Sequence, residues 1–119
     1  MTIITHQNNN TKMAEVISEN TVIGSIEDGL DILGDLYYQG FDAIILYEKN
    51  ITPLFFDLKN RMAGEILQKF SNYRMRLSII GDYGKYERKS VQDFIFESNK
   101  TGHVTFVNTL QEALNRFSA

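Results

Sequence analysis

The sequence predicts an α/β protein with a mostly parallel sheet, and two observations support this fold class. The first is a pair of short runs, residues 43–47 and 77–80, that are apolar without alternation, as strands covered on both faces are. The second is that segments with helical spacing of apolar residues lie between and beyond these runs. Strands that alternate with helices favour parallel pairing through right-handed crossovers.

Length and composition limit the classes of protein. The chain has 119 residues, 43% of them hydrophobic, which is enough for one compact core, and we expect a single domain over residues 1–119. The net charge of −3 leaves no basic surplus to neutralise phosphates, so nucleic acid is not an expected partner. The absence of cysteine excludes disulfides and thiolate ligands. No run approaches the roughly 18 apolar residues that span a bilayer, so we expect a cytoplasmic protein without membrane contact.

The N-terminal segment predicts a β-hairpin. Thr2–Thr5 and Met13–Ile17 have the composition of strands, and three consecutive asparagines lie between them. Asparagine suits a turn because it tolerates left-handed backbone and bonds to its own main chain. The hairpin places an antiparallel strand at one edge of the sheet.

The first helix has clear start and stop signals. Ser25 followed by Asp28 resembles a capping box, and Gly40 supplies the stop. Gly29 and Gly34 inside this helix each cost about 1 kcal/mol relative to alanine, and close approach to the sheet is a reason to place glycine there. The expected apolar face consists of Ile26, Leu30, Leu33 and Tyr37.

A second helical segment begins at Thr52 and Pro53. Thr52 is a suitable cap, and proline is favoured at the first helical position because its missing N–H has no partner there. Helical spacing of apolar residues then continues to Tyr73. The polar stretch Lys59–Arg61 favours a break into a short and a long helix.

The C-terminal third adds a helix, a strand and a helix. Ser90 with Asp93 and Thr109 with Glu112 match the capping-box pattern at two helix starts. His103–Val107 alternates as a strand does. The expected order is β-β-α-β-α-β-α-β-α, with about four helices.

Candidate functional residues follow the ends of the two buried strands, because ligands of open α/β sheets bind beyond the carboxyl ends of the strands. Glu48 and Asp82 would provide two carboxylates for acid–base chemistry or for a divalent metal. Alternatively, they cap neighbouring helices or contact water. The candidate rim comprises Glu48, Asn50, Thr52, Asp82 and Tyr83.

Three large apolar residues, Leu54, Phe55 and Phe56, follow each other at the start of the second helical segment. A single helix face cannot bury all three in its own core. An exposed remainder would indicate an interface, since aromatic anchors dominate contact energies. The alternative is a short irregular helix that turns both phenylalanines inward.

Four strings carry a resemblance to a known family: ILYEKNITPLFFDLKNRMAGEILQKFSNYR, LSIIGDYGKY, FIFESNKTGH and FVNTLQEAL. They resemble the bacterial family catalogued as domain of unknown function 4180, over nearly the whole chain from Met13 onward. The element order is also similar to that of the STAS domains, the sulfate-transporter and anti-sigma-factor-antagonist group. That resemblance implies a small cytoplasmic interaction module. In the antagonists a serine at the corresponding helix start is phosphorylated, and here Thr52 is the only hydroxyl at that position.

The sequence favours a non-enzymatic, regulatory or protein-interaction module of STAS-like architecture. Its expected contact region is Leu54–Lys59, with an unidentified protein partner or a second copy in a homodimer. The alternative is a small-molecule sensor or minor hydrolase that uses the rim around Glu48 and Asp82. No cofactor or metal is expected, because the two histidines have no metal-ligand spacing.

Overall fold

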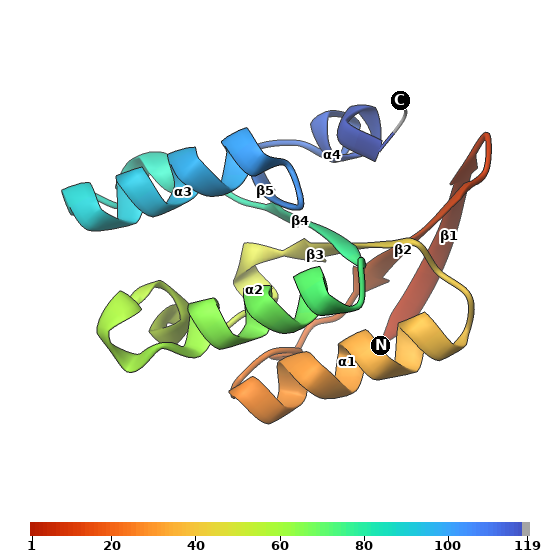
Figure 1. Ribbon diagram of the computed structural model, residues 1–119, viewed down its shortest axis with the longest axis horizontal. Coiled ribbons are helices and arrows are strands. Elements are labelled where there is room, and N and C mark those ends of the chain that lie inside the picture. The colour runs from red at the N-terminus through yellow and green to blue at the C-terminus, as the bar shows by residue number, and fades with distance from the viewer. Residues whose placement is uncertain (118–119) are drawn as a thin grey trace.

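The computed structural model describes residues 1–117 as a five-stranded sheet flanked by four α-helices (Figure 1). The strand order is β1-β2-β3-β4-β5, with β1 antiparallel to β2 and all other neighbours parallel. The predicted fold class is therefore confirmed. The strands are β1 (Thr2–Asn8), β2 (Thr11–Ile17), β3 (Ala43–Tyr47), β4 (Arg76–Ile80) and β5 (Val104–Val107), and the helices are α1 (Ile26–Tyr38), α2 (Met62–Asn72), α3 (Lys89–Thr101) and α4 (Leu110–Phe117).

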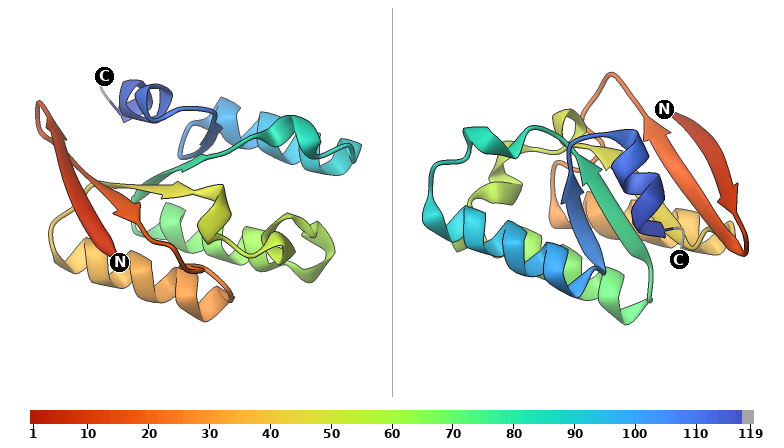
Figure 2. Two further views of the ribbon diagram at one scale, coloured as in Figure 1. Left: turned by 180° about the vertical axis from the view of Figure 1, so that it is seen from behind. Right: turned by 90° about the horizontal axis from the view of Figure 1, so that it is seen from above.

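The helices divide unequally between the two faces of the sheet. Each parallel strand pairs with the next one along the chain, and right-handed crossovers then place the connecting helices α1, α2 and α3 on one face. Helix α4 follows the last strand and covers part of the other face, where Ala113 and Phe117 pack on β2–β5 (Figure 2). The larger core lies under α1–α3. None of the described helices is long and apolar enough to cross a membrane.

The β-hairpin is longer than the sequence predicted. Its turn is reduced to Asn9 and Asn10, and Asn9 has the left-handed backbone (φ 55°) that asparagine tolerates. Seven residues of β1 pair with β2 without interruption. His6 and Gln7, which follow the predicted strand Thr2–Thr5, therefore belong to β1.

Helix α1 begins and ends as predicted, but its buried face is rotated. Ser25 caps it by accepting a hydrogen bond from the Asp28 N–H (3.1 Å), and Gly40 beyond its end has φ +90°. Its buried residues are Gly29, Ile32, Leu33 and Leu36, whereas Tyr37 is exposed. Gly29 was expected to allow close approach to the sheet, and this expectation was wrong. A Cβ at this position would instead lie 2.9 Å from Ile66 of α2, so the glycine allows close approach of the two helices.

Of the two capping boxes predicted for the C-terminal helices, the structure confirms one and contradicts the other. Thr109 accepts a hydrogen bond from the Glu112 N–H (3.1 Å), which confirms the cap of α4. Helix α3 instead begins at Lys89, and its Asp93 carboxylate lies 3.2 Å from the Lys89 ammonium. The Ser90 capping box was therefore wrong.

The predicted break in the second helical segment is confirmed. The chain forms two short 3₁₀ helices, η2 (Pro53–Phe56) and η3 (Leu58–Asn60), before α2 begins. Arg61 between η3 and α2 has left-handed backbone (φ 63°), which no continuous α-helix accommodates. The turn of chain that carries η2 and η3 stands beside the carboxyl edge of the sheet.

Candidate functional site at the carboxyl edge of the sheet

Glu48 is the central charged residue of this edge. It follows β3 directly and is buried, and its Oε2 lies 2.8 Å from the Lys85 ammonium. The same oxygen accepts a hydrogen bond from the Tyr86 hydroxyl. The neighbouring strand makes room for it with Gly81, since a Cβ on that residue would lie 2.7 Å from the Glu48 Cβ. One buried carboxylate is thus held by a cation and a phenol.

Tyr83 and Tyr86 cover the site from the loop after β4. The Tyr83 hydroxyl donates to the Ile79 carbonyl (2.7 Å), and its ring contacts the rings of Phe56 and Phe106. Burial, followed by the nearby Glu48 charge, raises the pKa of Tyr83 well above its usual range. Burial and the hydrogen bond to Glu48 likewise raise the pKa of Tyr86. Both phenols therefore stay protonated and act as donors.

Asn50 and Thr52 hold the backbone of this edge together. The Asn50 amide donates to the Ser18 and Asn20 carbonyls (2.8 and 2.9 Å), which fastens the segment after β2 to the end of β3. Its Oδ1 is buried and has no hydrogen-bond partner among residues 1–117. Thr52 accepts a long hydrogen bond from the Leu54 N–H (3.4 Å) as the cap of η2. Asn50 and Thr52, two of the predicted rim residues, thus stabilise the local backbone through hydrogen bonds.

Asp82 does not join Glu48. Its Oδ1 accepts a hydrogen bond from the Gly84 N–H (3.2 Å) at the exposed start of a short turn. This is the capping role that the sequence offered as the alternative to acid–base chemistry. Among residues 1–117 no group of three or more His, Asp or Glu side chains is arranged to hold a metal ion. The rim therefore brings Glu48 together with Tyr86 and Lys85, not with Asp82.

The structure corrects the aromatic part of the predicted interface. Phe55 and Phe56 are only 0% and 5% exposed, so neither ring projects from the surface. Their rings contact each other and Phe106 of β5, so the short helix η2 is packed on more than one of its sides. Leu54 is 55% exposed and is the one member of the trio that faces solvent.

A cleft of about 470 Å³ separates η2 from the loop before α3. Phe56, Tyr86 and Val91 provide its apolar surface. Side chains of both charges line it, with Asp57 opposite the 85–88 segment. The lining residues are Pro53, Phe56, Asp57, Lys85, Tyr86, Glu87, Arg88 and Val91.

A second polar cluster, which the sequence pattern did not predict, lies on the sheet face that α4 leaves open. Glu15 of β2 is only 4% exposed; one of its oxygens accepts from the Tyr47 hydroxyl (2.6 Å), and the other lies 2.8 Å from His6 Nε2. Burial, then the hydrogen bond to Glu15, raises the pKa of Tyr47 to about 12. The signal was the single charge inside the apolar run Met13–Ile17, combined with the two-residue turn that brings His6 beside it.

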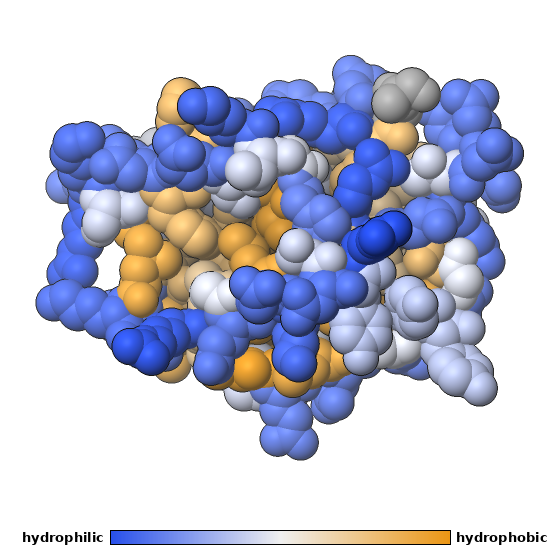
Figure 3. Space-filling view, in the orientation of Figure 1, coloured by the Kyte–Doolittle hydropathy of each residue, from blue (hydrophilic) through white to orange (hydrophobic). Residues whose placement is uncertain are grey.

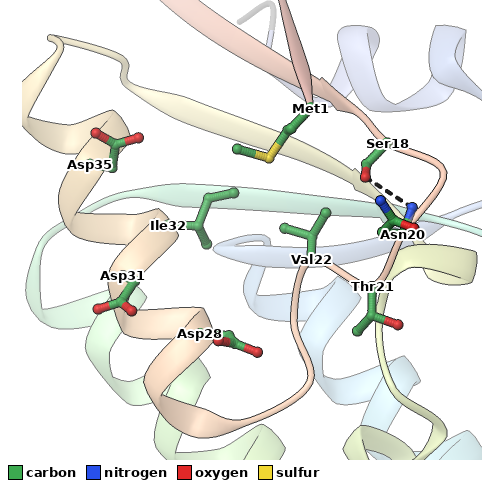
Figure 4. A pocket seen from close by; sticks show the side chains of 9 residues that line it. All are labelled: Met1, Ser18, Asn20, Thr21, Val22, Asp28, Asp31, Ile32 and Asp35. Carbon is green, nitrogen blue, oxygen red and sulfur yellow. Dashed lines mark hydrogen bonds between the residues drawn. The ribbon is translucent and has the colours of Figure 1, made fainter.

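An acidic groove of about 500 Å³ lies between α1 and the start of the hairpin. In Figure 4, Asp28, Asp31 and Asp35 lie along α1 on one side of the groove, with Met1 and Val22 on the other. The Gly24 N–H donates to Asp28 (2.8 Å). Among residues 1–117, none of the three aspartates forms an ion pair.

These features define a small α/β protein whose carboxyl edge carries one buried, paired carboxylate beside a cleft. The chain belongs to the family described as Domain of unknown function (DUF4180), whose model matches residues 8–117. No match was found among curated proteins or among solved structures.

Proposed function

We propose that the protein is a cytoplasmic interaction or regulatory module that binds another protein at its carboxyl edge. The observation that carries this proposal is the placement of Leu54. Its side chain is exposed, while the next two residues, Phe55 and Phe56, anchor the same short helix in the core. An apolar side chain held in place before binding loses little conformational freedom when a partner covers it.

The surroundings of Leu54 resemble the rim of a protein interface. The adjacent cleft combines an apolar floor with charges of both signs, and interfaces typically have an apolar centre and a polar border. Figure 3 shows further apolar surface in the hollow between α2 and α3, bordered by hydrophilic side chains. The similarity of the element order to that of the STAS interaction modules also supports a role in protein binding.

The test compares Leu54→Asp with a matched control, Tyr38→Asp. Tyr38 is 93% exposed at the end of α1, on the opposite edge of the sheet, so both variants place a charge on an exposed apolar position. Affinity purification from the native cells should recover a partner with the wild type and Tyr38→Asp, and lose it with Leu54→Asp. Circular dichroism checks that both variants fold. Recovery of the same proteins by Leu54→Asp would overturn the proposal.

A small-molecule sensor or a minor hydrolase at the same edge is the second candidate. The cleft has the volume of a small-ligand site, and Glu48 with Lys85 offers one charge of each sign beside it. A metabolite that raises the melting temperature of the wild type but not of Glu48→Gln would favour this function. Glu48→Ala and Asp82→Ala variants that leave every cellular phenotype unchanged would exclude a hydrolase.

A further inference from the structure

The outer edge of β1 is an unpaired strand edge. Among residues 1–117, no strand pairs with it, and Figure 2 shows it at the margin of the sheet without a helix beside it. The pair that flanks a two-residue hairpin turn exchanges its backbone hydrogen bonds, and pairs then alternate along the hairpin. The N–H and C=O groups of Ile3, Thr5 and Gln7 therefore point away from β2.

This edge lacks the features that normally prevent strand addition. Natural edge strands are protected by short length, charged side chains, proline or a bulge. The β1 sequence TIITHQN contains no Lys, Arg, Asp, Glu or Pro, and its seven residues pair with β2 without a bulge. The other edge strand, β5, has four residues, all buried. Only β1 offers a long, regular edge.

The acidic groove lies on the helix side of this edge. Helix α1 runs antiparallel to β2 and therefore in the direction of β1, and it lines the groove with Asp28, Asp31 and Asp35. Side chains of a strand added to β1 would point alternately toward the helix side and the opposite side. Those on the helix side would lie near the aspartates.

We propose that β1 binds an extended, basic segment of another protein as a sixth strand. Backbone hydrogen bonds to residues 3, 5 and 7 would provide affinity, and the aspartates would select the sequence. Asp31 and Asp35 are separated by about 6 Å along α1, and alternate side chains of a strand by about 7 Å. The favoured segment therefore carries Lys or Arg at positions i and i+2. This surface is separate from the one around Leu54, so either proposal stands if the other fails.

A second copy of the chain is the other occupant that would fit the unpaired edge of β1. A two-fold axis through Thr5 would pair β1 with its copy and keep both α1 helices on the same side of the joined sheet. The two rows of aspartates would then face each other across the axis. That like-charge arrangement opposes a homodimer and favours a basic partner.

The experiment is an NMR titration of the protein with synthetic, end-blocked peptides. TKVKVKT has lysines at alternate positions, TEVEVET inverts their charge, and TKKVVKT keeps the charge but has no two lysines at positions i and i+2. We expect only TKVKVKT to bind well, to weaken with added salt, and to protect the amide protons of Ile3, Thr5 and Gln7 from exchange. Equal binding by TEVEVET or TKKVVKT would overturn the proposal, as would no response to any peptide at about 1 mM.

Variants separate the backbone and charge contributions. Asp31→Asn with Asp35→Asn should weaken TKVKVKT binding about 2- to 30-fold, if each exposed ion pair has its usual strength. Glu65→Gln with Glu97→Gln makes the same charge change on α2 and α3 and should leave the affinity unchanged. Thr5→Pro removes an outward N–H and should abolish binding, with the β2 amides checked for retained protection.

Three further results would contradict the inference. Unchanged affinity in the aspartate double variant would remove the basis for a basic partner. Full binding by a folded Thr5→Pro would exclude strand addition. A dimeric mass for the free protein, with the amides of residues 3, 5 and 7 already protected, would identify a second copy as the occupant. Leu54→Asp serves as a further control and should bind TKVKVKT as the wild type does.

Discussion

Replacing Gly81 by alanine is the most direct test of how the Glu48 site is built. A Cβ at position 81 would lie 2.5 Å from Glu48 Oε1 and 2.7 Å from Glu48 Cβ. The carboxylate can swing away, but the Cβ is fixed to the end of β3 and cannot. Gly84, in the same loop, would place its Cβ no closer than 3.5 Å to Asp82 Oδ1. Neither glycine has a positive φ, so alanine causes no backbone strain at either position.

The expected magnitude follows from two opposing effects. Forcing one carbon into a packed site costs about 1–3 kcal/mol. Replacing glycine in a compatible conformation returns about 0.4–1 kcal/mol by restricting the unfolded chain. Gly81→Ala should therefore lower the free energy of unfolding by up to about 2.6 kcal/mol, whereas Gly84→Ala should leave it unchanged or raise it slightly. Because both variants gain the same restriction of the unfolded chain, Gly81→Ala should be the less stable of the two by about 1–3 kcal/mol.

Urea denaturation followed by circular dichroism measures both variants. A titration of tyrosine absorbance gives a second readout, because a displaced Glu48 no longer accepts the Tyr86 hydrogen bond. The pKa of Tyr86, which that bond helps to raise, should move back toward its usual value in Gly81→Ala. Equal stabilities of Gly81→Ala and Gly84→Ala, with unchanged titrations, would refute this account of the site.

Further predictions concern α1 and the open sheet face. Gly29→Ala should be less stable than Gly34→Ala by about 1–3 kcal/mol, because the first Cβ meets Ile66 at 2.9 Å and the second meets nothing within 4 Å. Thermal or urea unfolding measures this difference in stability. Equal stabilities of the two variants would contradict the contact between α1 and α2. Tyr47→Phe should cost about 1–3 kcal/mol, since one oxygen of the buried Glu15 carboxylate loses its donor; a neutral result would show that water replaces the phenol. Because the pKa of Tyr47 is raised to about 12, its contribution is complete below pH 10 and is lost as the pH rises toward 12. The wild type should therefore lose more stability than Tyr47→Phe over that interval, and parallel curves would contradict the shift.

The sequence predicted features whose causes are local. The caps at Ser25 and Thr109, the stop at Gly40 and the break near Arg61 each depend on a few adjacent residues, and each was found in the structure. Apolar runs identified the central strands because burial on both faces removes alternation. The Ser90 capping box is the exception. Helix α3 begins at Lys89 with Arg88 at the cap position, so Ser90 already lies inside the helix.

Features that depend on distant contacts were not predictable in the same way. The buried face of α1 is set by its approach to α2 at Gly29, which its own spacing does not reveal. Phe55 and Phe56 are buried because Phe106, some fifty residues later, packs against them. Among the rim residues, Glu48 and Tyr83 acquired long-range side-chain partners. Glu48 contacts Lys85 and Tyr86, and Tyr83 contacts Phe56 and Phe106, none of which its own stretch of sequence reveals.

The strand order has a consequence for how the molecule forms. Every neighbour in the sheet is also the next strand along the chain, so each pairing closes either a two-residue turn or one helical crossover. No strand has to insert between two others that are already paired. We expect such short-range closure to permit rapid folding for a sheet protein. A chain emerging from the ribosome would be able to add its strands to the sheet in the order of synthesis, beginning with the edge strand β1.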